Sequence, residues 1–386
     1  MKKQKFNSGR NPHTILIHNA RLITGNRITD NSWIFIRNSK IVKIGHGAKP
    51  VLKDTLYINA KSSYVAPGFI DLHIHGDMNK ISNTQAKFGT TGFLLSLHTR
   101  SLNQFSRSLF ESEDTLLQGA RCLGFHLEGP FINREMAGAQ PRRFVIDPDI
   151  TAVRSLIKNA QKKIKIITIA PELKNSTALI KLLKRNKVVA AIGHTDANIE
   201  QTKRAIDNGC LYTTHVFNRM SGISSRNPGV ITQVLLDDRI TAEVIADMHH
   251  VHPDNLRLLV KCKMLDKIVL VSDSVAAMDS KSLKVIAGVY RMENLALNRT
   301  GSGLGYVIAG SKLNLLQAVK NMIYLCGVSI VNAVNMASLN PAKVIGVENI
   351  KGKITTGYDA DLVIFNKNFH CKMTLVGGRI VYKCSN

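Results

Sequence analysis

The chain contains 386 residues, and its 52 basic and 27 acidic residues give a formal net charge of +25. With 44% hydrophobic residues, a chain of this length can bury the core of one large domain and a small one. No apolar stretch reaches the roughly 18 to 20 residues of a membrane-spanning helix. Basic residues are spread along the chain and aromatic residues make up only 6%, so we expect no membrane or nucleic-acid partner, and a basic surface that attracts anionic substrates.

The amino-terminal segment does not have the composition of a signal peptide. Basic residues within 1–5 are followed by polar residues 7–13, where a signal peptide has an apolar stretch. We therefore expect a cytoplasmic protein. The six cysteines have no Cys-x-x-Cys spacing, which favours buried, reduced thiols over a zinc knuckle or a disulfide framework.

Both ends of the chain have the composition of a small β-structure. Residues 14–17, 33–36 and 40–44 are short runs rich in β-branched and aromatic residues, separated by Asn, Gly and Lys. The same composition returns near the other end, in residues 360–365 and 373–382. We expect one β-sandwich domain from both termini, formed by residues 13–66 and 350–384.

The middle of the chain, residues 67–349, alternates between strand-like and helix-like segments. Apolar residues with helical spacing occur in residues 103–118, 149–161, 176–185, 199–208, 254–263 and 313–325. Repeated alternation of this kind predicts an α/β fold with a parallel sheet, either closed as a (β/α)8 TIM-type barrel or open and doubly wound. The glycine-rich residues 301–305 lack the Lys-Ser/Thr of a phosphate loop, so we interpret them as a flexible turn.

Six side chains that can bind a metal ion or carry a proton follow short apolar runs. They are His73, His75, Glu128, His194, His215 and Asp273. Because alternate side chains of a strand point to the same face, the first two histidines can contact one metal ion. Barrel enzymes place their chemistry at the carboxyl ends of the strands. The pattern therefore predicts a metal-dependent hydrolase.

Several segments of the chain resemble the amidohydrolase superfamily, and within it the N-acetylglucosamine-6-phosphate deacetylases. Residues 67–76, Pro-Gly-Phe-Ile-Asp-Leu-His-Ile-His-Gly, are general to the superfamily. The segments that are similar to the deacetylase branch in particular are residues 126–131, 193–197, 214–218, 227–229 and 309–311. The resemblance implies a (β/α)8 barrel with an appended β-sandwich, and a homodimer in which a neighbouring subunit completes the substrate pocket.

The resemblance also implies which residues hold metal. Glu128, His194 and His215 would bind the main divalent ion, and His73 with His75 would bind a second one that Glu128 bridges. One or two ions per subunit follow, with zinc or iron as the candidates, since these ligand types suit several metals. A divalent ion lowers the pKa of bound water and polarises the carbonyl of an amide.

Asp273 would act as the general base toward the metal-bound water and then as the acid toward the leaving amine. One carboxylate can serve both steps because the tetrahedral intermediate separates them in time. The alternative for Asp273 is a cap for the helix that follows. His126 lies on the same strand face as Glu128, and we interpret it as a packing residue or a residue that orients a ligand.

By the same resemblance, Arg226 matches a phosphate-binding arginine, since a guanidinium pairs with two phosphate oxygens at once. A solvated surface arginine is the alternative. His250 matches a substrate-contacting histidine, although proximity alone does not separate it from His249 and His252. The other matches are Asn218 and Arg219 near the phosphate, Ala139 and Gln140 over the sugar, and Ile308, Ala309 and Gly310 on the acetyl side.

Three departures from the family pattern fall around the substrate pocket. Arg219 stands where relatives have a small residue, and Met248 stands where a glycine is common, close to His250. The glycine-rich loop after Gly76 is shorter than usual. These departures concern the identity of the substrate more than the class of reaction.

We therefore expect a hydrolase of a linear amide bond, which converts N-acetylglucosamine-6-phosphate to glucosamine-6-phosphate and acetate in amino-sugar catabolism or recycling. One alternative is the deacetylation of N-acetylgalactosamine-6-phosphate. Another is a different amidohydrolase, although the bridging carbamylated lysine of the cyclic-amide branch has no evident counterpart near Glu128. A non-catalytic basic binding protein is a third alternative, which the complete set of ligands and Asp273 argues against.

Overall fold

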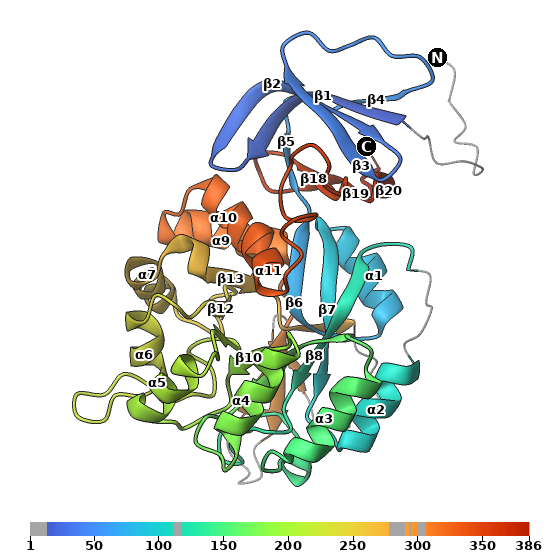
Figure 1. Ribbon diagram of the computed structural model, residues 1–386. Coiled ribbons are helices and arrows are strands. Elements are labelled where there is room, and N and C mark those ends of the chain that lie inside the picture. The colour runs from blue at the N-terminus through green and yellow to red at the C-terminus, as the bar shows by residue number, and fades with distance from the viewer. Residues whose placement is uncertain (1–13, 112–116, 278–289, 293–294, 300–305, 386) are drawn as a thin grey trace.

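The computed structural model describes residues 14–111, 117–277, 290–292, 295–299 and 306–385, and between residues 276 and 309 only the backbone is described. The glycine-rich residues 301–305, interpreted above as a turn, lie outside the described residues. The chain forms a barrel and a separate terminal sheet (Figure 1).

The barrel consists of parallel strands that follow one another in chain order. They are β6 (Phe69–Gly76), β7 (Thr90–His98), β8 (Arg121–Glu128), β9 (Ile164–Ile169), β10 (Val189–Ile192), β11 (Tyr212–Thr213), β12 (Ala242–Ile245) and β13 (Ile268–Val271). Strands β6 to β11 pair in sequence, a bridge from Tyr212 to Thr241 joins β11 to the start of β12, and β12 pairs with β13. The Asp273 amide donates to the His73 carbonyl at 2.8 Å, which closes the barrel onto β6.

The remaining barrel-side strands extend the sheet beyond β6. They are β14 (Ser274–Ala277), β15 (Tyr290–Met292), β16 (Leu295–Arg299) and β17 (Tyr306–Ser311). Strand β14 pairs in parallel with β6 and β17, and β15 to β17 pair antiparallel. The closed parallel arrangement confirms the expected TIM-type barrel and excludes the open, doubly wound sheet.

Helices cover the outside of the barrel strands. They are α1 (Met78–Ala86), α2 (Leu102–Glu111), α3 (Ile150–Asn159), α4 (Ser176–Arg185), α5 (Ile199–Asp207), α6 (Val230–Leu236), α7 (Pro253–Cys262), α9 (Leu315–Cys326), α10 (Ile330–Ala337) and α11 (Leu339–Val344). A helix overlaps each of the six segments with helical spacing, although in the segment 103–118 the described helix ends at Glu111. Helices α1, α6, α10 and α11 were not expected from the periodicity of the sequence, and α9 to α11 lie between the barrel and the terminal sheet (Figure 1).

Side-chain caps explain where several of these helices begin. Asp149 accepts from the amides of Thr151 and Ala152 at the start of α3, and Asn198 forms a reciprocal capping box with Gln201 at the start of α5. Asp77 accepts from the Lys80 amide and starts α1 directly after Gly76. The loop after β6 is therefore short because α1 begins almost directly after that strand.

The terminal sheet contains strands from both ends of the chain. They are β1 (Thr14–Thr24), β2 (Arg27–Arg37), β3 (Lys40–His46), β4 (Leu56–Asn59), β5 (Tyr64–Pro67), β18 (Leu362–Phe365), β19 (Cys371–Val376) and β20 (Arg379–Lys383). Their order is β20-β19-β18-β5-β1-β2-β3, with β4 beside β1. Strand β18 from the carboxyl-terminal part of the chain therefore pairs with β5 from the amino-terminal part. This sheet has its own apolar core, which includes Ile15, Ile34, Leu362 and Leu375.

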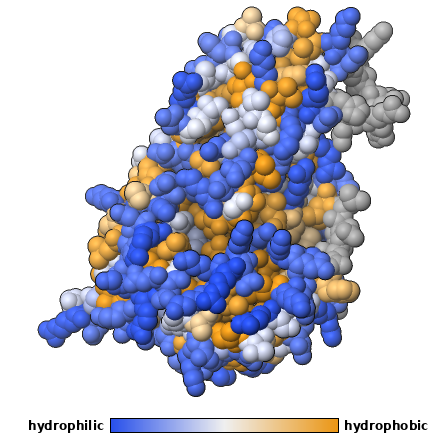
Figure 2. All heavy atoms as spheres, in the orientation of Figure 1, coloured by the Kyte–Doolittle hydropathy of each residue, from blue (hydrophilic) through white to orange (hydrophobic). Residues whose placement is uncertain are grey.

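The face of the molecule in Figure 2 is largely hydrophilic, with apolar residues in small groups. Among the described residues, no helix has the length and apolarity to cross a membrane. All six cysteines are free, but only Cys210 and Cys371 are buried, and Cys262 is exposed. The expectation of buried thiols was therefore wrong for Cys262, because it lies on the outer side of α7 at its last residue.

Candidate active site

The six metal-capable side chains meet at the carboxyl ends of the barrel strands. His73 and His75 belong to β6, and Glu128 is the last residue of β8. The other three each follow a strand by two residues: His194 after β10, His215 after β11 and Asp273 after β13. Parallel strands end at the same side of a barrel, so the fold collects residues that are up to 200 positions apart, from 73 to 273.

Three of these residues have a backbone conformation that is unusual for a residue with a side chain. The φ angle is 49° at His194, 32° at His215 and 45° at Asp273. A left-handed conformation in a residue other than glycine costs on the order of 1–3 kcal/mol and is common at functional sites. Hydrogen bonds hold it in place, for example from the Asn133 amide to the His194 carbonyl at 2.8 Å.

One cluster of possible ligands is formed by Glu128, His194 and His215. Glu128 Oε1 lies 2.9 Å from His194 Nε2 and 3.2 Å from His215 Nε2. The two Nε2 atoms are themselves 3.2 Å apart. All three residues are buried, and their ligand atoms lie within 4.8 Å of one another. Two imidazole nitrogens directed at one carboxylate oxygen are typical of a metal-ligand set.

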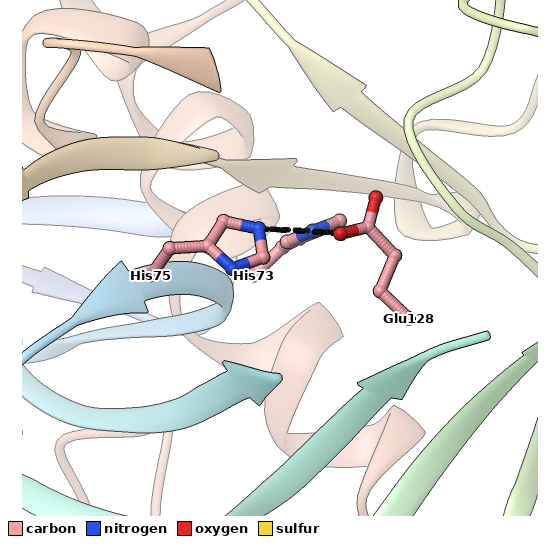
Figure 3. Close-up of side chains that lie close together, drawn as sticks. All are labelled: His73, His75 and Glu128. Atoms are coloured by element: carbon pink, nitrogen blue, oxygen red, sulfur yellow. Dashed lines mark hydrogen bonds and ion pairs between the residues drawn. The ribbon is translucent and has the colours of Figure 1, made fainter. Parts of the chain in front are cut away.

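A second cluster uses the other oxygen of the same carboxylate. Glu128 Oε2 lies 3.3 Å from His75 Nε2 and 3.6 Å from His73 Nε2, and Figure 3 shows both histidines directed toward it. Asp273 Oδ1 also lies close to these histidines, 3.2 Å from His75 Nε2 and 3.6 Å from His73 Nε2. Glu128 thus stands between the two histidine pairs, as expected for a bridging carboxylate.

Both carboxylates of the site favour the ionised form. Burial alone would raise the pKa of Glu128, but the charge of His73 and the hydrogen bonds from His194 and His215 hold that pKa well below its ordinary value. Burial likewise opposes ionisation of Asp273, yet the charges of His73 and His75 keep the pKa of Asp273 below its ordinary value. Two buried carboxylates this close together are costly unless cations lie beside them, either protonated imidazoles or a metal ion.

Glu243 is part of the site and was missed by the sequence analysis. It is fully buried in β12, where Oε1 lies 2.8 Å from His73 Nδ1 and accepts from the His215 amide at 2.9 Å. Oε2 accepts from the Tyr212 hydroxyl at 2.7 Å. Glu243 therefore orients two candidate ligands at once. The available signal was a carboxylate inside the apolar run of residues 242–245.

Two other histidines, His126 and His98, lie next to the candidate ligands. His126 Nε2 lies 2.8 Å from the Thr168 hydroxyl and Nδ1 lies 3.2 Å from the Leu72 carbonyl, so this side chain is committed to the barrel interior. Burial and the charge of His73 lower the pKa of His126 to about 3. His98, which the sequence analysis left without a role, stacks on His75 with ring centres 3.8 Å apart and an interplanar angle of 6°.

A cavity of about 420 Å³ opens next to the two clusters. It is lined by Glu128, His75, His194, His215 and Asp273. Of the expected substrate contacts, those that line the cavity are Ala139, Gln140, Asn218, Arg219, His250 and Gly310.

Gln140 has a more specific position than the sequence suggested. Its amide nitrogen donates to Glu128 Oε2 at 2.6 Å, and its carbonyl oxygen accepts from the Thr99 amide at 2.8 Å. The side chain therefore holds the Glu128 carboxylate in place as well as lining the cavity. Gly310 has a φ of 106°, and a β-carbon there would lie 2.8 Å from the Asp273 carbonyl oxygen, so only glycine fits.

His250 is held in place by Asp247. Its Nδ1 lies 2.7 Å from Asp247 Oδ2, and its buried Nε2 has no hydrogen-bond partner among the described residues. Met248 is 44% exposed and has a φ of 68°, which suits the glycine that is common at this position. Met248 is thus directed to solvent and does not fill the cavity.

The remaining expected contacts are not placed in the cavity. Arg226 is exposed and does not line it. Ile308 and Ala309 lie in β17, but their side chains are outside the described part of the chain. In a single chain, the cavity is therefore lined by candidate metal ligands and by six of the expected substrate contacts, but not by Arg226.

Comparison with known families agrees with this geometry. The model of the family described as "Amidohydrolase family" matches residues 64–381. The chain belongs to the amidohydrolase family. The match includes the whole barrel and, in the terminal sheet, β5, β18, β19 and the first part of β20.

Two relatives of this chain are named as deacetylases of different amino-sugar phosphates. An N-acetylglucosamine-6-phosphate deacetylase of Lysinibacillus sphaericus is 32% identical, over 97% of this chain and 99% of its own length. An N-acetylgalactosamine-6-phosphate deacetylase of Escherichia coli O157:H7 is 30% identical, over 82% of this chain and 87% of its own length.

Solved structures have the same architecture. The N-acetylglucosamine-6-phosphate deacetylase of Pasteurella multocida superimposes with a TM-score of 0.84 at 26% identity, covering 95% of this chain and 99% of that one. A mutant of the Mycobacterium smegmatis deacetylase, in complex with N-acetyl-D-glucosamine-6-phosphate, has a TM-score of 0.81 at 28% identity, covering 96% of this chain and 100% of that one.

Proposed function

We propose that this amidohydrolase removes the acetyl group of N-acetylglucosamine-6-phosphate, giving glucosamine-6-phosphate and acetate in amino-sugar metabolism. The observation that carries this proposal is the convergence of Glu128, His194, His215 and Asp273 on one cavity at the carboxyl end of the barrel. Relatives that match nearly the whole chain have this activity in their names.

The donor set fits a divalent metal ion. Glu128, His194 and His215 would hold the main ion, because two Nε2 atoms only 3.2 Å apart repel unless a proton or a cation lies between them. His73 and His75, with Nε2 atoms also 3.2 Å apart, would hold a second ion that shares Glu128. Zinc and iron suit these ligands. A bound ion would polarise the acetyl carbonyl and acidify water.

Asp273 is the proposed proton carrier. Its carboxylate is ionised, faces the cavity and lies beside His75, so it can accept a proton from the attacking water. The same carboxyl then returns that proton to the nitrogen that leaves as the amine. Gly310 allows the backbone of β17 to approach the Asp273 carbonyl, and the Ser311 amide donates to that carbonyl at 2.8 Å, which holds the backbone of Asp273 in place.

The substrate would lie across the cavity, with its phosphate toward Arg219 and Asn218. His250 Nε2 is buried and unpartnered, and Asp247 fixes the ring, so this nitrogen is available to a sugar hydroxyl. We assign Ala139 and Gln140 to the sugar side of the pocket, and Ile308, Ala309 and Gly310 to the acetyl side.

Arg226 requires a second subunit in this proposal. It is exposed on a segment outside the cavity of its own chain. A guanidinium is nevertheless well suited to bind a phosphate, because it can donate two parallel hydrogen bonds to it. We propose a homodimer in which Arg226 reaches the phosphate bound by the neighbouring subunit. An Arg226→Ala variant should then raise KM with little change in kcat. An unchanged KM would contradict this role.

We also propose that residues 13–66 and 350–384 fold as one unit, a β-sandwich, and that residues 67–349 form the catalytic barrel. The pairing of β5 with β18 supports this division, because it joins the two ends of the chain. A cytoplasmic location remains a prediction from the sequence.

The test of the proposal is acetate release from a panel of substrates. N-acetylglucosamine-6-phosphate should be hydrolysed. N-acetylglucosamine without the phosphate should be hydrolysed poorly, since the arginines proposed to bind the phosphate would have no anionic partner. Preference for N-acetylgalactosamine-6-phosphate would favour the second candidate, which the relative of that name supports. No acetate from any acetylated amino sugar would reject the proposal.

A further inference from the structure

A second cavity lies at the amino end of the barrel, opposite the candidate active site. Its volume is about 700 Å³. The lining includes the segments that lead into five consecutive barrel strands, β9 to β13, and residues of α11 complete it. Because these strands are parallel, segments that are far apart in the sequence meet at one end of the barrel. Of the candidate ligands and substrate contacts whose side chains are described, none lines this cavity.

The lining of this cavity is strongly basic. Seven of its twenty residues are Lys or Arg, against 52 of 386 in the whole chain, so the fold concentrates cations here. Asp266 is the single acidic residue among these twenty described residues. The cations are Lys162, Lys165, Lys184, Lys187, Lys267 and Lys343, together with Arg239.

Only part of this charge is neutralised by the protein. Arg239 pairs with Asp207 at 2.9 Å and with Asp237 at 2.7 Å, and Lys343 lies 3.5 Å from Asp266. Lys165, Lys184 and Lys187, by contrast, form no ion pair with any residue that the structure describes. Like charges around one hollow repel each other, and a concave wall focuses their field on the space inside. This cavity therefore attracts anions.

We infer that this basic cavity binds a compact polyanion, a short linear chain of phosphate groups such as inorganic tripolyphosphate or the triphosphate of a nucleotide. Its volume is that of a small-molecule site. A single phosphate would leave most of the cations unpaired, whereas a chain of phosphates can reach cations from several strands. Lysine ammonium groups bind phosphate as point charges and impose little geometry on it.

A nucleic-acid strand fits this cavity less well. Tyr212 is the one aromatic residue among the described residues that line it, and Tyr212 is 1% exposed with its hydroxyl bound to Glu243. Bases therefore find no stacking surface among the described residues that line the cavity. Asn340 Oδ1 is buried and without a partner among the described residues, which offers an acceptor to a ligand hydroxyl.

The experiment is a calorimetric titration of the full-length protein with tripolyphosphate at an ionic strength of about 0.15 M. The test variant carries Lys165→Gln, Lys184→Gln and Lys187→Gln. The matched control carries Lys53→Gln, Lys203→Gln and Lys372→Gln, which removes the same charge from exposed positions outside the cavity. The test variant should bind about tenfold more weakly, or about 1.4 kcal/mol, and the control should bind as the wild type does.

Further titrations separate the outcomes. ATP that binds at least as tightly as tripolyphosphate, with the same dependence on the three lysines, supports the inference for a nucleotide, and weaker binding of ATP supports inorganic polyphosphate. Equal weakening in the two triple variants would overturn it, because diffuse surface charge would then be responsible. Orthophosphate bound as tightly as tripolyphosphate, tighter binding of a single-stranded oligonucleotide, or loss of binding in Arg219→Ala alone would also overturn it. Thermal unfolding of each variant verifies that it is folded.

Discussion

At the carboxyl end of the barrel, His73, His75, His194 and His215 surround Glu128, and none of the five is more than 4% exposed. At the amino end, Lys162, Lys184 and Lys187 are exposed around an open cavity. Buried polar groups depend on one another, since the loss of one leaves its partner unsatisfied. Exposed charges are screened by water and salt, and each contributes little.

The comparison predicts large effects of single substitutions at the carboxyl end and small effects at the amino end. It also predicts an exception wherever a charged group near the amino end is buried.

The largest effect is expected for Asp273→Asn. An amide cannot accept the proton of the attacking water, so turnover should fall by about 10²–10⁴-fold. Metal content measured by atomic emission should stay near that of the wild type, because Glu128, His194 and His215 are unchanged. Turnover within a few-fold of the wild type would remove Asp273 from the mechanism.

The buried exception is Lys351, which lies where the terminal sheet joins the barrel. Its Nζ is 2.7 Å from Asp359 Oδ2 and 2.6 Å from Asp361 Oδ2, and the residue is 7% exposed. Lys351→Met would leave the buried Asp361 carboxylate without an ion pair and would leave Asp359 with Lys40, at 2.7 Å, as its close partner. The free energy of unfolding should therefore fall by about 3 kcal/mol. Urea unfolding measures this change.

The control for this variant is Lys367→Met, which removes an exposed lysine from the same sheet region. Its free energy of unfolding should change by less than about 0.5 kcal/mol. Equal effects of the two substitutions would show that burial does not decide the cost.

A smaller effect on catalysis is expected for Glu243→Gln. The amide keeps the size of the side chain but removes the charge beside His73 Nδ1, which lies 2.8 Å away. Loss of a group that orients a metal ligand typically costs about 10–100-fold in metal affinity or activity. Metal titration and steady-state kinetics measure both. Glu200→Gln, at an exposed position of α5, is the matched control and should behave as the wild type.

The smallest effect is expected for Asp237→Asn, near the basic cavity. The hydrogen bond from Arg239 lowers the pKa of Asp237 to about 2, from an ordinary value of 3.8. Its contribution to stability is therefore complete above about pH 4 and is lost as the pH falls toward 2. The melting temperatures of wild type and variant should differ slightly at neutral pH and converge in this range. A difference that grows toward acid would contradict the assignment.

The barrel and most of its helices could be predicted from the sequence because each depends on a local pattern. The helical spacing of residues 176–185 and 199–208 corresponds closely to α4 and α5. His73 and His75 were recognisable because the alternation of a strand places them on one face, and their Nε2 atoms do lie 3.2 Å apart.

Contacts that depend on how distant strands meet could not be predicted. Glu243 contacts His73 across 170 positions, and nothing in residues 242–245 identifies that partner. The lysines of the basic cavity appear evenly spread in the sequence. Lys165 and Lys187 nevertheless line the same cavity, because Lys165 lies at the start of β9 and Lys187 lies just before the neighbouring parallel strand β10. The proposed role of Arg226 depends on a second subunit, which the sequence of one chain does not place.

The most direct test of the proposed metal-dependent deacetylation is acetate release from N-acetylglucosamine-6-phosphate by protein of known metal content. We expect at least one zinc or iron ion per subunit, loss of acetate release on removal of the metal by a chelator, and recovery when the metal is restored. Full activity of the metal-free protein, or no acetate release by the metal-loaded protein, would contradict it.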